Sequence, residues 1–87
     1  MPLPISIEIL TRKDCSLCET AKEVIDKVIR DYFVTLKMTD IESSPELLKE
    51  FGEKIPVVRI EGETSFVYKV HPTTLRNKLD RIVKSGM

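Results

Sequence analysis

The stretch Asp14-Cys15-Ser16-Leu17-Cys18 decides how the rest of the chain is interpreted, because it places two cysteines three residues apart between two regular patterns. Before it, isoleucines at positions 5, 7 and 9 alternate with polar residues, which is the period-two pattern of a β-strand. After it, apolar residues at positions 17, 21, 24, 25, 28 and 29 follow the 3.6-residue period of a helix. The chain is therefore predicted to run from a strand through a short polar loop into a helix whose first turn carries the Cys-x-x-Cys.

A thiol at the start of a helix has distinctive chemistry. The first backbone N–H groups of a helix lack intrahelical partners, and the macrodipole places about half a positive charge there. Both effects stabilise a thiolate at Cys15, so we expect its pKa to lie below the ordinary thiol value of about 8.5. Cys18 continues along the buried stripe of the helix. We therefore expect Cys15 to be the exposed nucleophile and Cys18 to lie behind it, placed to resolve a mixed disulfide.

Two other interpretations of the cysteine pair remain open. A Cys-x-x-Cys can be half of a zinc site, but such a site needs two further ligands, and the chain offers only His71 and carboxylates. Free cysteines are also often buried and inert. The charged loop before Cys15 and the order of strand, loop and helix favour a redox-active pair over both.

The composition is that of one small globular domain, predicted to span residues 1–87, with 41% hydrophobic residues. Lys+Arg and Asp+Glu number 14 each, so the net charge indicates neither a nucleic-acid nor a membrane partner. Residues 1–4 lack the basic start and apolar run of a signal peptide. We therefore expect a cytoplasmic monomer, in a compartment where a Cys-x-x-Cys is more often catalytic than structural.

The first half of the chain has the length of a βαβ unit. The first helix should end near residue 31, and residues 33–38 alternate as a strand with one face open to water, as at a sheet edge. The strand–helix–strand passage predicts two parallel strands joined by a right-handed crossover. Glu8 on the first strand should find a partner or lie where the cover of the sheet is incomplete.

The second half of the chain predicts a short helix, a hairpin and a last helix. Ser43 and Glu46 have capping-box spacing, and the helix they start should stop at Gly52. Residues 55–60 predict a third strand opened by a proline, and a tight turn at 61–63 leads into a fourth strand at 64–69. The last helix should begin at residues 71–74, with a buried side made of Leu75, Leu79, Ile82 and Val83.

This order, β-α-β-α-β-β-α, with a Cys-x-x-Cys after the first strand and a proline opening the third, resembles the thioredoxin fold in its glutaredoxin-like form. The chain is also similar to a little-characterised glutaredoxin-like family with the motif Cys-x-Leu-Cys-(Asp/Glu)-x-Ala, as residues 15–21 read here, and Ile-Pro-Val, as residues 55–57 read. The resemblance implies an α/β fold with a four-stranded mixed sheet and helices on both faces.

The resemblance also implies roles for five residues. Cys15 and Cys18 would be the catalytic dithiol, and Arg12, Ile55 and Pro56 would bind the substrate, with the Ile55–Pro56 peptide in the cis form. It implies no metal and no resident cofactor.

Two departures separate the chain from the glutaredoxins that use glutathione. Those proteins carry an aromatic residue between the cysteines, where Leu17 stands here, and a Gly-Gly before the last helix, where Val70-His71 stands. Bulky residues disfavour the close backbone approach that glutathione needs. Glutathione is therefore kept only as an alternative electron donor, and His71, whose place before a proline is typical of a turn, is not counted as catalytic.

The sequence thus predicts a thiol–disulfide oxidoreductase with a redox-active disulfide, acting in electron transport. Its expected partners are a disulfide-containing protein or a small-molecule thiol, together with a reductase. The alternatives are a non-catalytic binding module of the same fold, and metal or iron–sulfur binding through the cysteines, bridged between two chains by Cys15.

Overall fold

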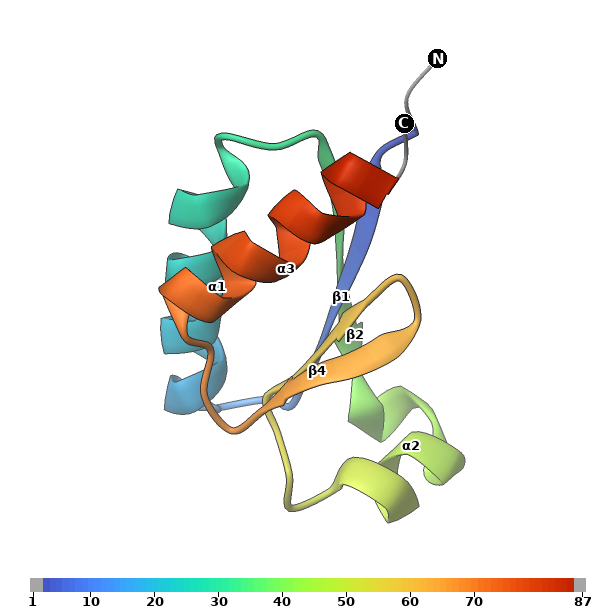
Figure 1. Ribbon diagram of the computed structural model, residues 1–87. Helices are drawn as coiled ribbons and strands as arrows, with labels where there is room; N and C mark the ends of the chain where they lie inside the picture. Colours follow the sequence, from blue (N-terminus) through green and yellow to red (C-terminus); the bar gives the residue numbers. More distant parts are fainter. Residues whose placement is uncertain (1–2, 86–87) are drawn as a thin grey trace.

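The computed structural model describes residues 3–85, so the domain prediction for 1–87 and the signal-peptide prediction for residues 1–4 fall partly outside the described residues. In chain order the elements are β1 (Ile5–Thr11), α1 (Ser16–Ile29), β2 (Val34–Asp40), the 3₁₀-helix η1 (Ile41–Ser43), α2 (Pro45–Phe51), β3 (Val57–Ile60), β4 (Glu63–Val67) and α3 (Pro72–Ser85) (Figure 1). No helix within residues 3–85 is long and apolar enough to cross a membrane.

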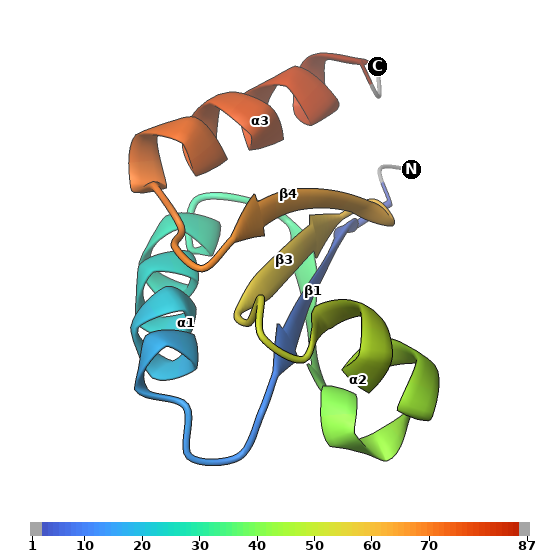
Figure 2. The same ribbon diagram turned by 90° about the horizontal axis from the view of Figure 1, so that it is seen from below.

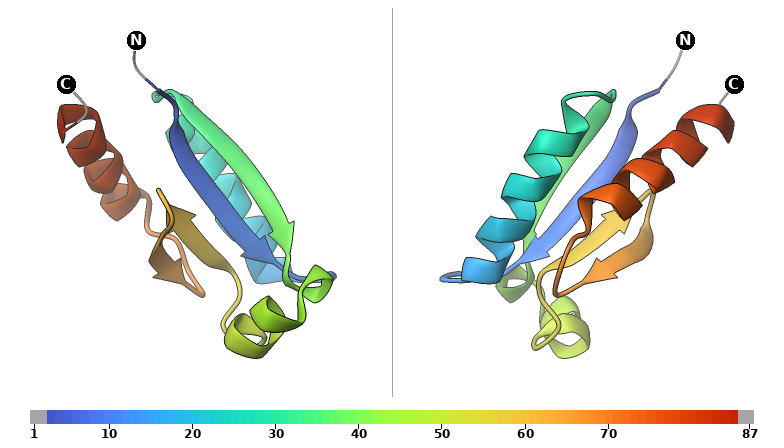
Figure 3. Two further views of the ribbon diagram at one scale, coloured as in Figure 1. Left: turned by 90° about the vertical axis from the view of Figure 1, so that its right-hand side faces the viewer. Right: turned by 60° about the vertical axis from the view of Figure 1, so that its left-hand side comes forward.

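The four strands form one mixed sheet in the order β2-β1-β3-β4. β1 pairs with β2 in parallel and with β3 in antiparallel register, and β3 pairs with β4 as an antiparallel hairpin. α1 and α3 lie on one face of the sheet, and α2 lies toward the other face beside the C-terminal end of β1 (Figures 2 and 3). The α/β fold, the mixed sheet and the edge position of β2 are therefore confirmed.

The two faces of the sheet have separate apolar clusters, because successive side chains of a strand point to opposite faces. The larger cluster lies under α1 and α3 and contains Ile5, Ile7, Ile9, Ala21, Ile25, Val28, Val58, Ile60, Phe66, Val70, Leu75 and Leu79. The smaller one lies under α2 and contains Leu10, Ile41, Phe51 and Val57, with Leu47 and Ile55 packed against it. α2 thus covers only one end of its face.

Glu8 lies on this incompletely covered face and has partners there. Its side chain is 24% exposed, and its Oε1 atom lies 3.7 Å from a guanidinium nitrogen of Arg59 on the neighbouring strand. The hydroxyl of Thr39 donates a hydrogen bond of 2.7 Å to its other carboxylate oxygen. The guanidinium of Arg59 also lies 5.3 Å from the centre of the Phe51 ring, a cation–π distance. Both outcomes expected for Glu8 are therefore observed together.

Polar contacts join the end of α1 to α3. The hydroxyl of Tyr32 donates a hydrogen bond of 2.6 Å to Asp80, and a guanidinium nitrogen of Arg76 lies 2.9 Å from a carboxylate oxygen of Asp31. The hydrogen bond to the Asp80 carboxylate raises the pKa of Tyr32 above its ordinary value, because it favours the protonated phenol.

The start of the second helix differs from the prediction by one residue. Ser44, not Ser43, is the N-cap, and its hydroxyl accepts a hydrogen bond from the Leu47 N–H. Residues 41–43 form η1 instead, capped by the Asp40 carboxylate, and the hydroxyl of Ser43 donates to the Asp40 carbonyl. The predicted capping box is therefore wrong, whereas the predicted stop is confirmed, since Gly52 caps the C-terminus of α2.

Several other boundaries also differ. α1 ends at Ile29, and β2 continues to Asp40. β3 begins at Val57 rather than at residue 55, since Pro56 has no N–H to contribute to the ladder. β4 ends at Val67, because Tyr68 adopts a left-handed backbone conformation with φ of 69°.

The tight turn between β3 and β4 is formed as predicted, whereas the end of α3 is more exposed than predicted. Glu61 and Gly62 both have positive φ, 52° and 82°, as a two-residue type I′ turn requires. Leu75 and Leu79 are fully buried and Ile82 is half-buried, but Val83 is 50% exposed. The prediction for Val83 is wrong because the last turns of α3 stand away from the sheet (Figure 2).

Candidate active site

Cys15 is the N-cap residue of α1. Its backbone is extended, with φ of −105° and ψ of 104°, and its Sγ atom accepts a hydrogen bond of 3.2 Å from the Cys18 N–H. Asp14, immediately before it, has φ of 58°, a left-handed conformation that aspartate tolerates better than most residues. The chain thus turns sharply after β1 and presents the sulfur of Cys15 to the unsatisfied N–H groups at the start of the helix.

The two cysteines are joined by a disulfide, and their Cα atoms are 5.3 Å apart. Cys18 is 4% exposed and faces inward from α1, whereas Cys15 is half-buried. The prediction that Cys15 is the more accessible of the two is confirmed. The lowered pKa of its thiol concerns the reduced state and stays a prediction.

The segment before β3 comes to the same end of the sheet. The Ile55–Pro56 peptide is cis, as predicted, and Pro56 is buried. The ladder pairs Leu10 with Val57, so its continuation places Pro56 opposite Thr11, the last residue of β1. Figure 1 shows this segment and the loop from β1 to α1 at one end of the sheet.

Arg12 is held by the α2 side of the molecule. Its Nε atom lies 3.0 Å from an Oε1 oxygen of Glu42 in η1, and its Nη1 atom donates a hydrogen bond of 3.2 Å to the Gly52 carbonyl at the end of α2. The structure therefore assigns Arg12 two intramolecular partners that the sequence did not indicate. Its contact with a substrate stays a prediction, as do those of Ile55 and Pro56.

The segment between β4 and α3 also reaches this end of the sheet. The Tyr68 N–H donates a hydrogen bond of 2.8 Å to the Pro56 carbonyl, and the Tyr68 side chain is 51% exposed. Val70 turns into the larger apolar cluster, whereas His71 is exposed and its carbonyl accepts from Leu75 in the first turn of α3. The sequence did not indicate that Tyr68 ends the strand and bonds to Pro56, because nothing in an alternating stretch signals that a tyrosine adopts a positive φ.

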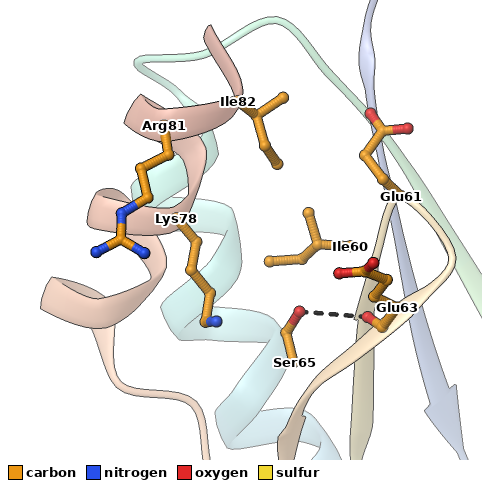
Figure 4. A pocket seen from close by; sticks show the side chains of 7 residues that line it. All are labelled: Ile60, Glu61, Glu63, Ser65, Lys78, Arg81 and Ile82. Carbon is orange, nitrogen blue, oxygen red and sulfur yellow. Dashed lines mark hydrogen bonds between the residues drawn. The ribbon is translucent and has the colours of Figure 1, made fainter. Parts of the chain in front are cut away.

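A cleft of about 320 Å³ lies at the other end of the molecule, between the β3–β4 hairpin and α3. Figure 4 shows that Glu61, Glu63 and Ser65 line one wall, Lys78, Arg81 and Ile82 line the other, and Ile60 forms the floor. None of these side chains is a thiol or an imidazole. Within residues 3–85, no three His, Cys, Asp or Glu side chains are grouped so as to hold a metal ion. The redox-capable groups of the described chain are therefore at the cysteine end.

Comparisons with known proteins agree with this arrangement. The family model described as "Glutaredoxin-like domain (DUF836)" matches residues 6–80. A glutaredoxin-like protein YDR286C homolog from Dictyostelium discoideum is 29% identical over 86 residues, which cover 92% of this chain and 80% of that protein.

Solved structures agree in fold. The X-ray structure of protein XcR50 from X. campestris is 23% identical, covers 86% of this chain and 96% of its own, and superposes with a TM-score of 0.72. Oxidised mitochondrial thioredoxin 3 from Saccharomyces cerevisiae is 19% identical, covers 88% of this chain and 77% of its own, and gives a TM-score of 0.64. These likenesses confirm the thioredoxin-like fold. Since the family model spans most of the sequence, the chain belongs to the glutaredoxin-like domain family.

Proposed function

We propose that the protein is a thiol–disulfide oxidoreductase that uses Cys15 and Cys18. The observation that supports this most directly is the disulfide at the start of α1, whose two cysteine residues differ in exposure. Cys15 is half-buried and its sulfur accepts a hydrogen bond from the Cys18 N–H, whereas Cys18 is buried. A pair of inert packed cysteines has no need of this asymmetry.

In the proposed reaction, the Cys15 thiolate attacks one sulfur of a substrate disulfide. A new S–S bond forms to Cys15, the substrate S–S bond breaks, and one substrate thiolate leaves. The Cys18 thiolate then attacks the Cys15 sulfur and expels the second substrate thiolate. The substrate gains two electrons, the protein loses two, and the Cys15–Cys18 disulfide remains. An external dithiol or reductase, acting in the reducing cytoplasm, restores the two thiols by the reverse exchange.

The residues around the cysteines support a binding role at this end of the sheet. We assign substrate binding to Arg12, Ile55 and Pro56, because the loop to α1 and the segment before β3 converge there. The expected partners are a disulfide-containing protein or a small-molecule thiol. We expect the protein to act as a monomer.

We infer that glutathione binds poorly. At the start of α3, Pro72 is the first helical residue and has no N–H to donate to a ligand carboxylate. His71 is exposed directly before it, where a small residue would leave the backbone open. A dithiol or a thioredoxin reductase is therefore the proposed electron donor.

The test is a disulfide-reduction assay with insulin as the substrate and dithiothreitol as the donor. Cys15→Ser should abolish the rate above background. Reduced Cys18→Ser, mixed with insulin after the dithiothreitol has been removed, should accumulate a mixed disulfide that mass spectrometry detects. Ser16→Ala, between the two cysteines, is the matched control and should retain activity. Full activity of Cys15→Ser would refute the proposal.

A further inference from the structure

The ion pair between Arg12 and Glu42 lies directly beside the loop that carries Cys15. Arg12 is three residues before the cysteine, so their Cα atoms are within about 11 Å whatever the loop conformation. The partner carboxylate comes from η1, 30 residues further along the chain, and its Oε1 atom lies 3.0 Å from Nε of Arg12. Both side chains are partly exposed, so a ligand at this end of the sheet can reach them.

This pair changes the charge that the loop before Cys15 presents to a ligand. The other two charged residues of the loop, Lys13 and Asp14, have opposite signs. Arg12 would therefore be the one uncompensated cation of the loop, and Glu42 compensates it.

The contacts also occupy the donors that a ligand carboxylate would use. A guanidinium binds a carboxylate best through two parallel N–H groups. In Arg12, Nε donates to Glu42 and Nη1 donates to the Gly52 carbonyl. The edge of the guanidinium formed by Nε is thus already filled by a carboxylate of the protein itself.

We propose that Glu42 is a specificity-determining residue that disfavours anionic disulfides at this site, a role that rests on the proposed oxidoreductase function. A disulfide that bears carboxylates is repelled by the Cys15 thiolate as it approaches, and a free guanidinium nearby would offset the repulsion. With Glu42 in place, Arg12 no longer offsets this repulsion, so anionic disulfides react more slowly. Neutral disulfides are not repelled by the thiolate and are not slowed. Replacing Glu42 with a neutral residue releases the cation toward the ligand.

The experiment measures second-order rate constants of the reduced protein with three disulfides of different charge. These are oxidised glutathione, which is anionic, hydroxyethyl disulfide, which is neutral, and cystamine, which is cationic. Glu42→Gln should raise the ratio of the anionic to the neutral rate roughly two- to fivefold at low ionic strength, and should lower the ratio for cystamine. The change should shrink in about 0.5 M salt, where the screening length is only a few ångströms.

Dividing by the neutral rate removes any change in the thiolate fraction of Cys15, so the ratio reports ligand charge alone. Glu46→Gln is the matched control. It changes the net charge of the protein by the same amount, but Glu46 lies in α2 and has no ion pair among the described residues. The double variant Arg12→Gln/Glu42→Gln should lose the gain. Equal ratios for Glu42→Gln and Glu46→Gln would overturn the inference and leave the oxidoreductase function standing, whereas a wild-type protein that reacts with none of the three disulfides would overturn both.

Discussion

The acidity of the Cys15 thiol in the reduced protein can be worked out from the contacts of its sulfur. The Cys18 N–H lies 3.2 Å from Sγ, and a hydrogen bond to a charged acceptor contributes about 1.5–3 kcal/mol. The helix N-terminus adds about 0.3–1 kcal/mol. The neighbouring Asp14 carboxylate opposes the thiolate, by about 0.5 kcal/mol at this partly exposed site. The net stabilisation of the thiolate is about 1.3–3.5 kcal/mol, so the pKa of Cys15 should be lowered.

We therefore expect the pKa of the Cys15 thiol to lie below the value of about 8.5 of an ordinary thiol, because the helix start and the Cys18 N–H stabilise its thiolate. The measurement is the rate of alkylation by iodoacetamide as a function of pH, on the Cys18→Ser variant, which has one thiol and keeps the backbone N–H at position 18. The Cys15→Ser variant is the control, and its buried Cys18 should react slowly at every pH. A Cys15 reactivity that rises only around pH 8.5 would refute the argument that the helix start activates this sulfur.

Three further results are expected. Leu79→Ala should lower the free energy of unfolding by about 2–5 kcal/mol because Leu79 is fully buried, whereas Val83→Ala on the same helix should change it by less than about 0.5 kcal/mol. Urea denaturation of both variants measures these changes, and equal losses would contradict the packing of α3. Because the bond to Asp80 raises the folded-state pKa of Tyr32, its contribution to stability should be present below the ordinary tyrosine value of 10.0 and be lost as the pH rises through the raised value. Absorbance titration of the two tyrosines measures the raised pKa, and a Tyr32→Phe variant that keeps the late-titrating signal would disprove its assignment to Tyr32. Finally, glutathione should reduce the Cys15–Cys18 disulfide more slowly than a thioredoxin reductase or a dithiol does. The reason is that losing two or three charge-assisted hydrogen bonds weakens glutathione binding at least about a hundredfold. Faster reduction by glutathione would identify an ordinary glutaredoxin.

The repeating elements of the fold were accessible from the sequence because each leaves a local pattern. The alternation at Ile5, Ile7 and Ile9 indicates directly which side chains are buried, and the helical stripe does so from position 21 onward. The prediction is wrong for Leu17 at the start of the stripe, which is 54% exposed. The turn at Gly62 is equally local, since few other residues adopt its backbone conformation freely. Such features need no knowledge of the rest of the chain.

The features that were missed depend on contacts between distant segments. Ser43 and Ser44 are equally good caps, and the choice depends on the 3₁₀ turn that Asp40 stabilises. The exposure of Val83 depends on how far α3 diverges from the sheet. At the site, the cysteines and the proline could be found from spacing, but the pairing of Arg12 with a residue 30 positions away could not.

The order of the strands in the sheet has a consequence for how the chain is made. β1 and β3 are the two inner strands, yet residues 7–10 pair with residues 57–60, so the centre of the sheet closes only after two-thirds of the polypeptide exists. Until β3 is synthesised, β1 has an open edge that offers unpaired N–H and C=O groups to other chains. A nascent chain that stalls before Val57 should therefore be prone to aggregate, and the segment that brings Pro56 to the cysteines is also the one that ends this exposure.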